Sequence, residues 1–321
     1  MHMQKKQGII SLGEVLVDMI PLNAENTEYQ KSPGGAPANV AVGLSRLGID
    51  SYFIGAVGTD LIGHFLRKTL VEYGVNIQGL TQTALAKTPL VFVELAENGE
   101  RSFEFLIDHS ADQLLSTDDL AENLFQQAKI LHIGSISTIQ KTSRAATHKA
   151  IHLAQENGML VSFDPNLRLS IWPDELSALE QIKALLLTSD IVKLSEEELE
   201  FLTNETDETA AVLKLKDYQI PLLIITKGEH GSSFYTNTHK VNVPAYKVEA
   251  VDTTGAGDAF VSGVLAQLHD LDDPLDSLTP ETLQRIGAFA AVSGSLAAST
   301  KGAMTALPTK EEVEAILEER G

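Results

Sequence analysis

Residues 37–57 read PANVAVGLSRLGIDSYFIGAV and contain the alternation that decides the fold. Apolar residues recur at helical spacing over 38–47, with Pro37 close to the start and Gly48 just past the end. Proline in a first turn and glycine after a last turn are typical helix boundaries. The apolar run over 52–57 then predicts a buried strand. A helix followed closely by a buried strand is the repeating unit of an α/β fold.

The same alternation continues on both sides of this unit. Asp60 and Gly74 have the residue types that start and stop a further helix. Another helix is expected over 143–157, and the stretch 270–280 reads as a loop between helices. Together they predict a mostly parallel sheet with helices on both faces. Further buried strands are predicted at 8–12, 130–133, 160–163, 191–194 and 222–226.

Two segments interrupt the alternation. Residues 89–106, PLVFVELAENGERSFEFL, contain two strand-like runs around Asn98-Gly99, which is a strong hairpin signal. The run 15–20 is also strand-like and can pair with 29–31. We therefore predict a small β-sheet lid, formed by about 14–33 and 87–112, that projects from the main sheet.

Composition and charge exclude several classes of protein. The formal net charge of −20 repels nucleic acid and anionic membranes. The 321 residues contain no apolar run long enough for a transmembrane helix, and the first residues lack the apolar stretch of a signal peptide. Cysteine is absent, so we expect a cytoplasmic protein. Any bound anion must be held by a local positive field, such as a helix N-terminus, a metal ion or an arginine.

Residues 251–260, VDTTGAGDAF, can supply such a field. Apolar residues follow at helical spacing, which places Gly255, Ala256 and Gly257 at a helix N-terminus, where unpaired backbone N–H groups bind anions. Asp258 would lie in the first turn. An anion site beside a proton acceptor is what phosphoryl transfer to an alcohol needs. Asp258 could instead merely complement the helix dipole.

Two other phosphate-binding motifs do not fit. A dinucleotide fingerprint requires a third glycine where this chain has Phe260, and it requires a strand directly before the motif. No Gly-x-x-x-x-Gly-Lys-Ser/Thr sequence occurs, so a P-loop is excluded.

A second glycine-rich stretch, SPGGAPAN at 32–39, opens the first predicted helix. Gly34 and Gly35 permit close approach of a ligand to the backbone, and Asn39 can both donate to and accept from a sugar hydroxyl. Asp18 interrupts an apolar run, so it either faces solvent or binds a ligand. The alternative for the stretch is a plain turn with a solvated asparagine.

Two motifs, GGAPANVAVGLSRLG at 34–48 and DTTGAGDAF at 252–260, resemble the signatures of the ribokinase-like (PfkB) sugar kinases. Between them, NGERSFEFLIDHSADQLL, LHIGSIS, FDPNLRLSIWPDE and IVKLSEEELEFL resemble the fructokinase branch of that family. The resemblance extends from Gly13 to about Pro308. It implies a ribokinase-like three-layer α/β/α fold in a single domain over 1–321, with the lid described above.

The resemblance implies ATP-dependent phosphorylation of D-fructose to fructose 6-phosphate. Asp258 would be the general base, and Gly255, Ala256 and Gly257 would receive the transferring phosphoryl group. The sugar would be held by Asp18, Gly34, Gly35 and Asn39.

Two arginines are further candidates for substrate binding. Arg168 follows the strand at 160–163, where ligands of such sheets bind, although it could instead form a surface ion pair with Asp174 or Glu175. Arg101 lies on the lid hairpin and is the single basic residue of 89–106. The poor supply of cations there favours a neutral sugar over a carboxylated one.

The implied cofactors are ATP and Mg²⁺, with K⁺ as a candidate monovalent ion. Thr226, Gly228 and Gly231 in ITKGEHGSS resemble the nucleotide loop of the family, although an ordinary hairpin turn fits the same residues. Glu198 would approach Mg²⁺ through water. It is also the third residue of a capping box that begins at Ser195, where many relatives have asparagine. The monovalent ion would be held by Asp252, Thr254, Thr300 and Gly302.

Other functions remain open from the sequence. A sister kinase would act on 2-keto-3-deoxygluconate, ribose or a nucleoside, and a catalytically silent sensor would bind a sugar without turnover. In the family that the chain resembles, the lid sheet has exposed edges, and such edges invite pairing with a second subunit, so we expect a homodimer. The expected partners are a small sugar and ATP, with neither nucleic acid nor membrane among them.

Overall fold

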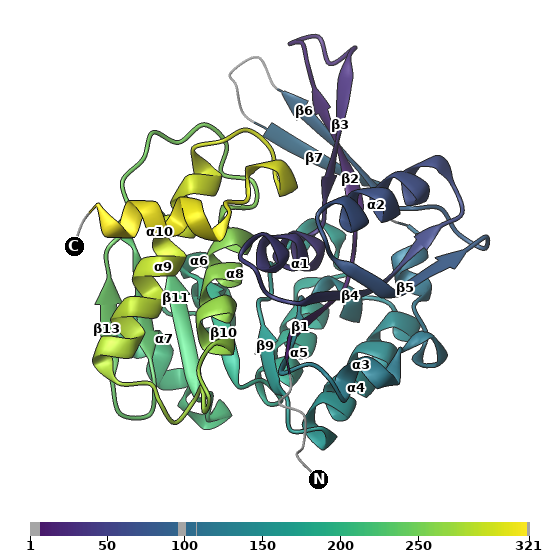
Figure 1. The fold of residues 1–321 in the computed structure, drawn as a ribbon. Helices are drawn as coiled ribbons and strands as arrows, with labels where there is room; N and C mark the ends of the chain where they lie inside the picture. Colours follow the sequence, from purple (N-terminus) through teal and green to yellow (C-terminus); the bar gives the residue numbers. More distant parts are fainter. Residues whose placement is uncertain (1–6, 96–100, 107, 320–321) are drawn as a thin grey trace.

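The main sheet of the protein is mostly parallel, as predicted. A computed structural model describes residues 7–95, 101–106 and 108–319, and within them nine strands lie in the order β13-β12-β11-β10-β9-β8-β1-β4-β5 (Figure 1). Neighbouring strands are parallel from β5 to β11, and β12 and β13 continue the sheet antiparallel. The strands are β1 (Ile9–Leu12), β4 (Ser51–Gly58), β5 (Asn76–Thr83), β8 (Ile130–Ile133), β9 (Leu160–Phe163), β10 (Ile191–Ser195), β11 (Leu222–Thr226), β12 (Ser232–Tyr235) and β13 (Lys240–Val243).

Helices cover both faces of this sheet because successive side chains of its strands point to opposite sides. Ile9 of β1 joins an apolar core beneath α1, α8, α9 and α10, whereas Ile10 joins a second core beneath α3 to α7. The first layer comprises α1 (Ala36–Arg46), α8 (Ala256–His269), α9 (Pro280–Ala298) and α10 (Lys310–Glu318). The second comprises α3 (Glu122–Phe125), α4 (Lys141–Glu156), α5 (Glu175–Leu186), α6 (Glu196–Thr203) and α7 (Glu208–Lys214).

A third apolar core lies under α2 (Leu61–Glu72), where Leu66 and Leu70 pack with Phe53 of β4 and Val17. Short 3₁₀ turns occupy Ala111–Leu114, Thr117–Asp119, Ile136–Thr138, Leu169–Ile171, Lys216–Tyr218, Gly228–His230 and Met304–Ala306. Of the helices that the structure describes, none combines the length and apolarity needed to cross a membrane.

The predicted small sheet is also present. In the described residues it has four strands in the order β3-β2-β6-β7, and Figure 1 shows it projecting from the body of the molecule beside α2. We call it the lid sheet. Its strands are β2 (Leu16–Pro21), β3 (Tyr29–Gly34), β6 (Leu90–Leu95) and β7 (Arg101–Leu106). β6 pairs antiparallel with β7, as the hairpin signal predicted, although the turn at Asn98-Gly99 lies outside the described residues.

Most predicted boundaries are confirmed within two or three residues. Asp60 caps α2 by accepting a hydrogen bond from the Gly63 backbone N–H (2.8 Å), and Gly74 follows that helix with a φ of 79°. The strand expected at 29–31 continues to Gly34, because β3 pairs with β2 along its whole length. The helix expected over 143–157 begins at Lys141.

The helices α1 and α8 cross with almost no side-chain volume between them. A Cβ atom at Gly43 of α1 would lie 2.3 Å from the Oγ of Ser262 on α8. Ser262 in turn donates to the carbonyls of Asp258 (2.7 Å) and Val40 (3.3 Å). On the other side of α8, a Cβ at Gly263 would lie 2.9 Å from the Cα of Ala290. Glycine at these positions therefore permits close packing of α1 against α8 and of α8 against α9.

We predict that Gly43→Ala lowers the free energy of unfolding by roughly 1–3 kcal/mol, the usual effect of overpacking a tight core. Alanine is the better helix former, so propensity alone would give the opposite sign. Urea unfolding followed by circular dichroism measures the change. The matched control is Gly43→Ala combined with Ser262→Gly, which restores the space and should recover part of the loss. An unchanged midpoint for Gly43→Ala alone would show that the crossing is not tight.

Candidate active site

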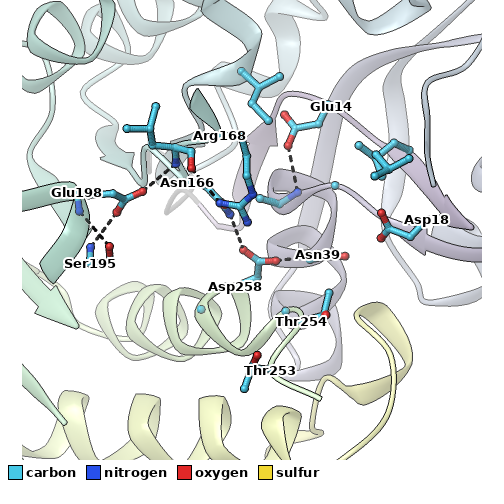
Figure 2. Close-up of a pocket in the computed structure, with 18 of the residues that line it drawn as sticks. Glu14, Asp18, Asn39, Asn166, Arg168, Ser195, Glu198, Thr253, Thr254 and Asp258 are labelled. Carbon is cyan, nitrogen blue, oxygen red and sulfur yellow. Dashed lines mark hydrogen bonds between the residues drawn. The ribbon is translucent and has the colours of Figure 1, made fainter. Parts of the chain in front are cut away.

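One cleft of about 740 Å³ lies where the carboxyl end of β10, the N-termini of α1 and α8, and the lid sheet meet. Ligands of open α/β sheets bind at this end of the strands. Figure 2 shows the labelled residues of the cleft converging from these elements. Predicted residues that line it are Asp18, Gly35, Asn39, Arg168, Glu198, Thr254, Gly255, Gly257 and Asp258.

The predicted anion site is present at the start of α8. Gly255 caps the helix with a φ of 79°, a conformation that favours glycine, and α8 begins at Ala256. Gly257 is exposed to the cleft, and a Cβ there would meet only Lys193 Nζ, at 3.8 Å. The Ala256 N–H donates to the Thr253 carbonyl (3.2 Å), whereas the open space around Gly257 lets an anion approach the backbone of that first turn.

Asp258 lies in the first turn of α8 and is buried, with 6% of its surface exposed. Its Oδ2 accepts a hydrogen bond from Asn39 Nδ2 (2.7 Å), and its Oδ1 accepts one from Asn166 Nδ2 (3.3 Å). Burial raises the pKa of Asp258 to about 6, and the hydrogen bond from Asn39 opposes that rise. The carboxyl group is thus mostly ionised at neutral pH, yet basic enough to take a proton.

The glycine pair before α1 is required by backbone and side-chain atoms that approach it closely. Gly35 has a φ of 103°, and a Cβ there would lie 2.6 Å from the carbonyl oxygen of Glu14. A Cβ at Gly34 would lie 2.5 Å from Asp18 Oδ2. The pair therefore lets the Glu14 backbone and the Asp18 carboxylate approach the start of α1, which also carries Asn39. A side chain at either position would collide with its neighbours, so the stretch is more constrained than the plain turn considered from the sequence.

Asp18 and Arg168 face the same cleft from β2 and from the loop after β9. Burial raises the pKa of Asp18 to about 6, and the charge of Arg168 lowers it. The guanidinium of Arg168 donates to the carbonyl of Leu167 (3.1 Å). Asp174, its alternative partner, instead accepts from the Ser177 N–H (2.7 Å) as the N-cap of α5.

Sequence reasoning missed a buried cation in this cleft. Lys193 of β10 forms an ion pair with Asp164 (3.2 Å), and both side chains are largely buried. Burial alone would lower the pKa of Lys193, but the carboxylates of Asp164 and Glu198 raise it, so the lysine stays charged. The available signal was a single charged residue inside the apolar run 191–194, the same signal that identified Asp18.

Asn166 and Glu14 were missed for a different reason. Asn166 has a φ of 43° in the loop after β9, and this conformation directs its amide toward Asp258. Glu14 is buried just before β2. Neither belongs to an apolar run or a glycine motif, so only the fold reveals that they line the cleft.

Glu198 joins two elements of the cleft wall. Its Oε1 accepts from the Leu167 N–H and its Oε2 from the Ser195 N–H, each at 2.8 Å. Ser195 Oγ accepts from the Glu198 N–H (3.1 Å), which confirms the predicted capping box. Across the described residues, no group of three or more histidine and acidic side chains could hold a metal alone. Because both oxygens of Glu198 already accept backbone hydrogen bonds, this side chain would reach a metal ion only through a water ligand.

The residues expected around a monovalent ion lie on two loops joined by Asp252. Its Oδ1 accepts from the Thr254 N–H (3.1 Å), and its Oδ2 accepts from the Gly302 N–H (3.2 Å). Thr300 is exposed in the turn that follows α9. The loop before α8 and the loop after α9 are therefore adjacent, beside the anion site.

The predicted nucleotide loop has hairpin geometry. Thr226 ends β11 opposite Ser195, which lines the cleft. Gly228 and Gly231 have φ values of 52° and 92°, and the Lys227 N–H closes the turn on the Gly231 carbonyl (2.8 Å). Residues 226–231 therefore form the hairpin turn that was the alternative interpretation. The turn lies next to the cleft and is not part of its lining.

Arg101 begins β7, and its side chain lies outside the described part of the chain. Phe105, on the same strand, lines the cleft. Four residues of strand correspond to about 13 Å, so the backbone of Arg101 stands well away from Phe105 along the lid sheet.

Comparison with known proteins agrees with this geometry. The family described as pfkB family carbohydrate kinase matches residues 6–310. Probable fructokinase-5 of Arabidopsis thaliana is 42% identical, over 97% of this chain and 98% of that protein. The crystal structure of a fructokinase with bound ATP from Xylella fastidiosa has a TM-score of 0.91 at 35% identity, covering 98% of this chain and 99% of the other.

A double-mutant fructokinase from Vibrio cholerae, in a form with bound fructose, ADP and potassium ion, has a TM-score of 0.89 at 38% identity. The alignment covers 98% of this chain and all of that one. This chain therefore belongs to the pfkB family of carbohydrate kinases, and its ribokinase-like fold is the one implied by the motifs.

Proposed function

We propose that this protein is an ATP-dependent fructokinase that converts D-fructose to fructose 6-phosphate. The observation that carries the proposal is the position of the Asp258 carboxylate, which is buried in the first turn of α8 beside the amides of 255–257. A proton acceptor and an anion site are thereby a few residues apart in one cleft. The fructokinases among its relatives support fructose as the sugar.

In the proposed reaction the sugar hydroxyl attacks the γ-phosphorus of ATP in line. Its O–H bond breaks, a new bond forms between its oxygen and the γ-phosphorus, and the bond from that phosphorus to the β–γ bridging oxygen breaks. Asp258 takes the proton. The amides of Gly255, Ala256 and Gly257 stabilise the charge that develops on the phosphoryl oxygens, helped by the cations Lys193 and Arg168.

The sugar is proposed to bind between the lid sheet and the start of α1. Asp18 and Asn39 would hold its hydroxyl groups, and the absence of side chains at Gly34 and Gly35 would let it approach the backbone. Arg168 would lie over the same site, and Arg101 remains a prediction for the lid. In the free protein Asn39 Oδ1 is buried and has no partner among the described residues, so it can accept from a ligand.

The nucleotide is proposed to lie along the hairpin of Thr226, Gly228 and Gly231, with its phosphates reaching the start of α8. Mg²⁺ bound to those phosphates would neutralise charge during transfer, with Glu198 oriented toward its water ligands. Asp252, Thr254, Thr300 and Gly302 would hold K⁺ beside the anion site. The choice of K⁺ is supported by the relative from Vibrio cholerae, which has a form with a bound potassium ion.

We extend the proposal to a cytoplasmic homodimer whose protomers, each a single kinase domain of 1–321, pair through the lid sheet. β3 and β7 form the two edges of that sheet, and unpaired strand edges invite association. Light scattering in solution is expected to give about twice the 34.7 kDa of the chain. A molar mass equal to that of one chain would contradict the dimer but not the kinase.

We predict that Asp258→Asn lowers kcat for fructose phosphorylation by at least about 10²-fold, the typical effect of losing a positioned base. Asparagine keeps the size of the side chain, so the fold and the Kd for fructose should change little. A coupled assay of ADP release over a panel of sugars measures the rate and also separates fructose from 2-keto-3-deoxygluconate, ribose and nucleosides. Near-normal turnover would remove the base assignment, and a preference for another sugar would correct the substrate.

The pH dependence of kcat/KM provides an independent prediction. An acid with a pKa of about 6 must be ionised to act as a base, so kcat/KM should fall as the pH is lowered through about 6. The hydrogen bond from Asn39 lowers that pKa, so Asn39→Ala should move the acidic limb to higher pH. An acidic limb that stays in place in Asn39→Ala would mean that another group controls it.

A further inference from the structure

Glu14 is a buried acid of the cleft to which the proposed reaction gives no role. It is 4% exposed, and its Oε1 accepts a hydrogen bond from the Ala36 N–H at the start of α1 (3.1 Å). Its Oε2 is buried and has no hydrogen-bond partner among the described residues. Figure 2 shows Glu14 and Asp18 near the same N-terminal turn that carries Asn39.

A second buried atom of the same wall, Asn39 Oδ1, also has no partner in the described part of the chain. Buried polar atoms are almost always hydrogen-bonded in native proteins, so each exception needs an explanation. Glu14 and Asn39 both line the cleft. A ligand that carries hydroxyl groups and enters the cleft can supply the missing partners.

The surroundings of Glu14 favour its neutral form. Burial raises the pKa of Glu14 to about 8, although hydrogen bonds from backbone N–H groups oppose the rise. Asp112, in the 3₁₀ turn after β7, and Asp258, on α8, face it with like charge and raise the pKa further. Asp18 on β2, with Lys193 on β10 and Arg168 on the loop after β9, shares the cleft.

We propose that Glu14 is a specificity-determining residue that binds the sugar as a neutral carboxylic acid, with Oε2–H donating to a sugar oxygen while Asn39 Oδ1 accepts from an adjacent hydroxyl. The inference rests on the proposed sugar kinase function and deepens it. Glu14 donates one hydrogen bond and the ionised Asp18 accepts another, so the pair recognises a neutral polyhydroxy substrate. When Glu14 loses its proton it can no longer donate. Glu14 and Asp18 are then two acceptors facing one sugar hydroxyl, which has a single proton to give, and binding weakens.

Two variants of Glu14 separate this role from a structural one. Glu14→Gln keeps an oxygen for the Ala36 N–H and supplies an N–H donor that does not titrate. Glu14→Leu is similar in size and has no polar atom. The Kd for D-fructose without nucleotide is measured by calorimetry between pH 6.5 and 9.5, with the KM for ATP as the control for an intact nucleotide site.

The expected result is a wild-type Kd for fructose that rises at least about fivefold between pH 7 and 9.5. Glu14→Gln should bind fructose with an affinity that changes little over this range. Glu14→Leu should bind about tenfold or more weakly, the usual consequence of losing one hydrogen bond to a ligand. A pH-independent wild-type Kd, or Glu14→Gln as weak as Glu14→Leu, would overturn the role of Glu14. Failure of the wild-type protein to bind or phosphorylate any sugar would instead overturn the proposed function.

The protonation of Glu14 is also measurable without a ligand. A carboxyl group whose pKa is higher in the folded state stabilises the protein most below its unfolded pKa, and that contribution is lost as the pH rises through the folded value. The stability of the wild-type protein relative to Glu14→Gln should therefore fall as the pH rises from about 4.5 to about 8. A constant difference in urea midpoint over this range would show that Glu14 does not titrate as proposed. The same unfolding curves show whether Glu14→Leu is folded.

Discussion

The hydrogen bond from Asn39 to Asp258 is the contact on which the rest of the site depends. It joins residues 219 positions apart in sequence, on the first turns of α1 and α8. The bond is possible because Gly43 and Ser262 let these helices approach closely, and because Gly263 lets α8 approach α9. The same contact opposes the rise in the pKa of Asp258 that burial causes. Packing of two helices therefore sets the position of the proposed base and limits the rise in its pKa that burial causes.

A chain with a net charge of −20 repels a phosphate, so a phosphate site needs positive groups close by. The cleft has such groups: the amides at the start of α8, the exposed guanidinium of Arg168, and Lys193. Lys193 remains charged despite burial because acidic side chains surround it. The same cleft also carries the acids Asp18, Glu198 and Asp258, so these positive groups act only at short range.

The fold and about half of the site could be predicted because the sequence patterns that mark them lie within short segments of the chain. Helical spacing after Gly257 fixes the start of α8, the glycine pair at 34–35 fixes the start of α1, and a lone acid in an apolar run marks Asp18. Lys193 carried the same signal as Asp18, but one charged residue in a strand does not say what it faces. Asn166 and Glu14 acquire their environment only when β9, α1 and α8 meet, so their roles depend on contacts between segments that the sequence separates.

The most direct measurement is a crystal structure of the protein with D-fructose and a non-hydrolysable ATP analogue bound together. The account predicts that the hydroxyl to be phosphorylated lies about 2.6–3.2 Å from a carboxylate oxygen of Asp258, with the terminal phosphate on the amides of 255–257. A sugar bound with all of its hydroxyl groups out of reach of Asp258, or a terminal phosphate held elsewhere, would contradict it.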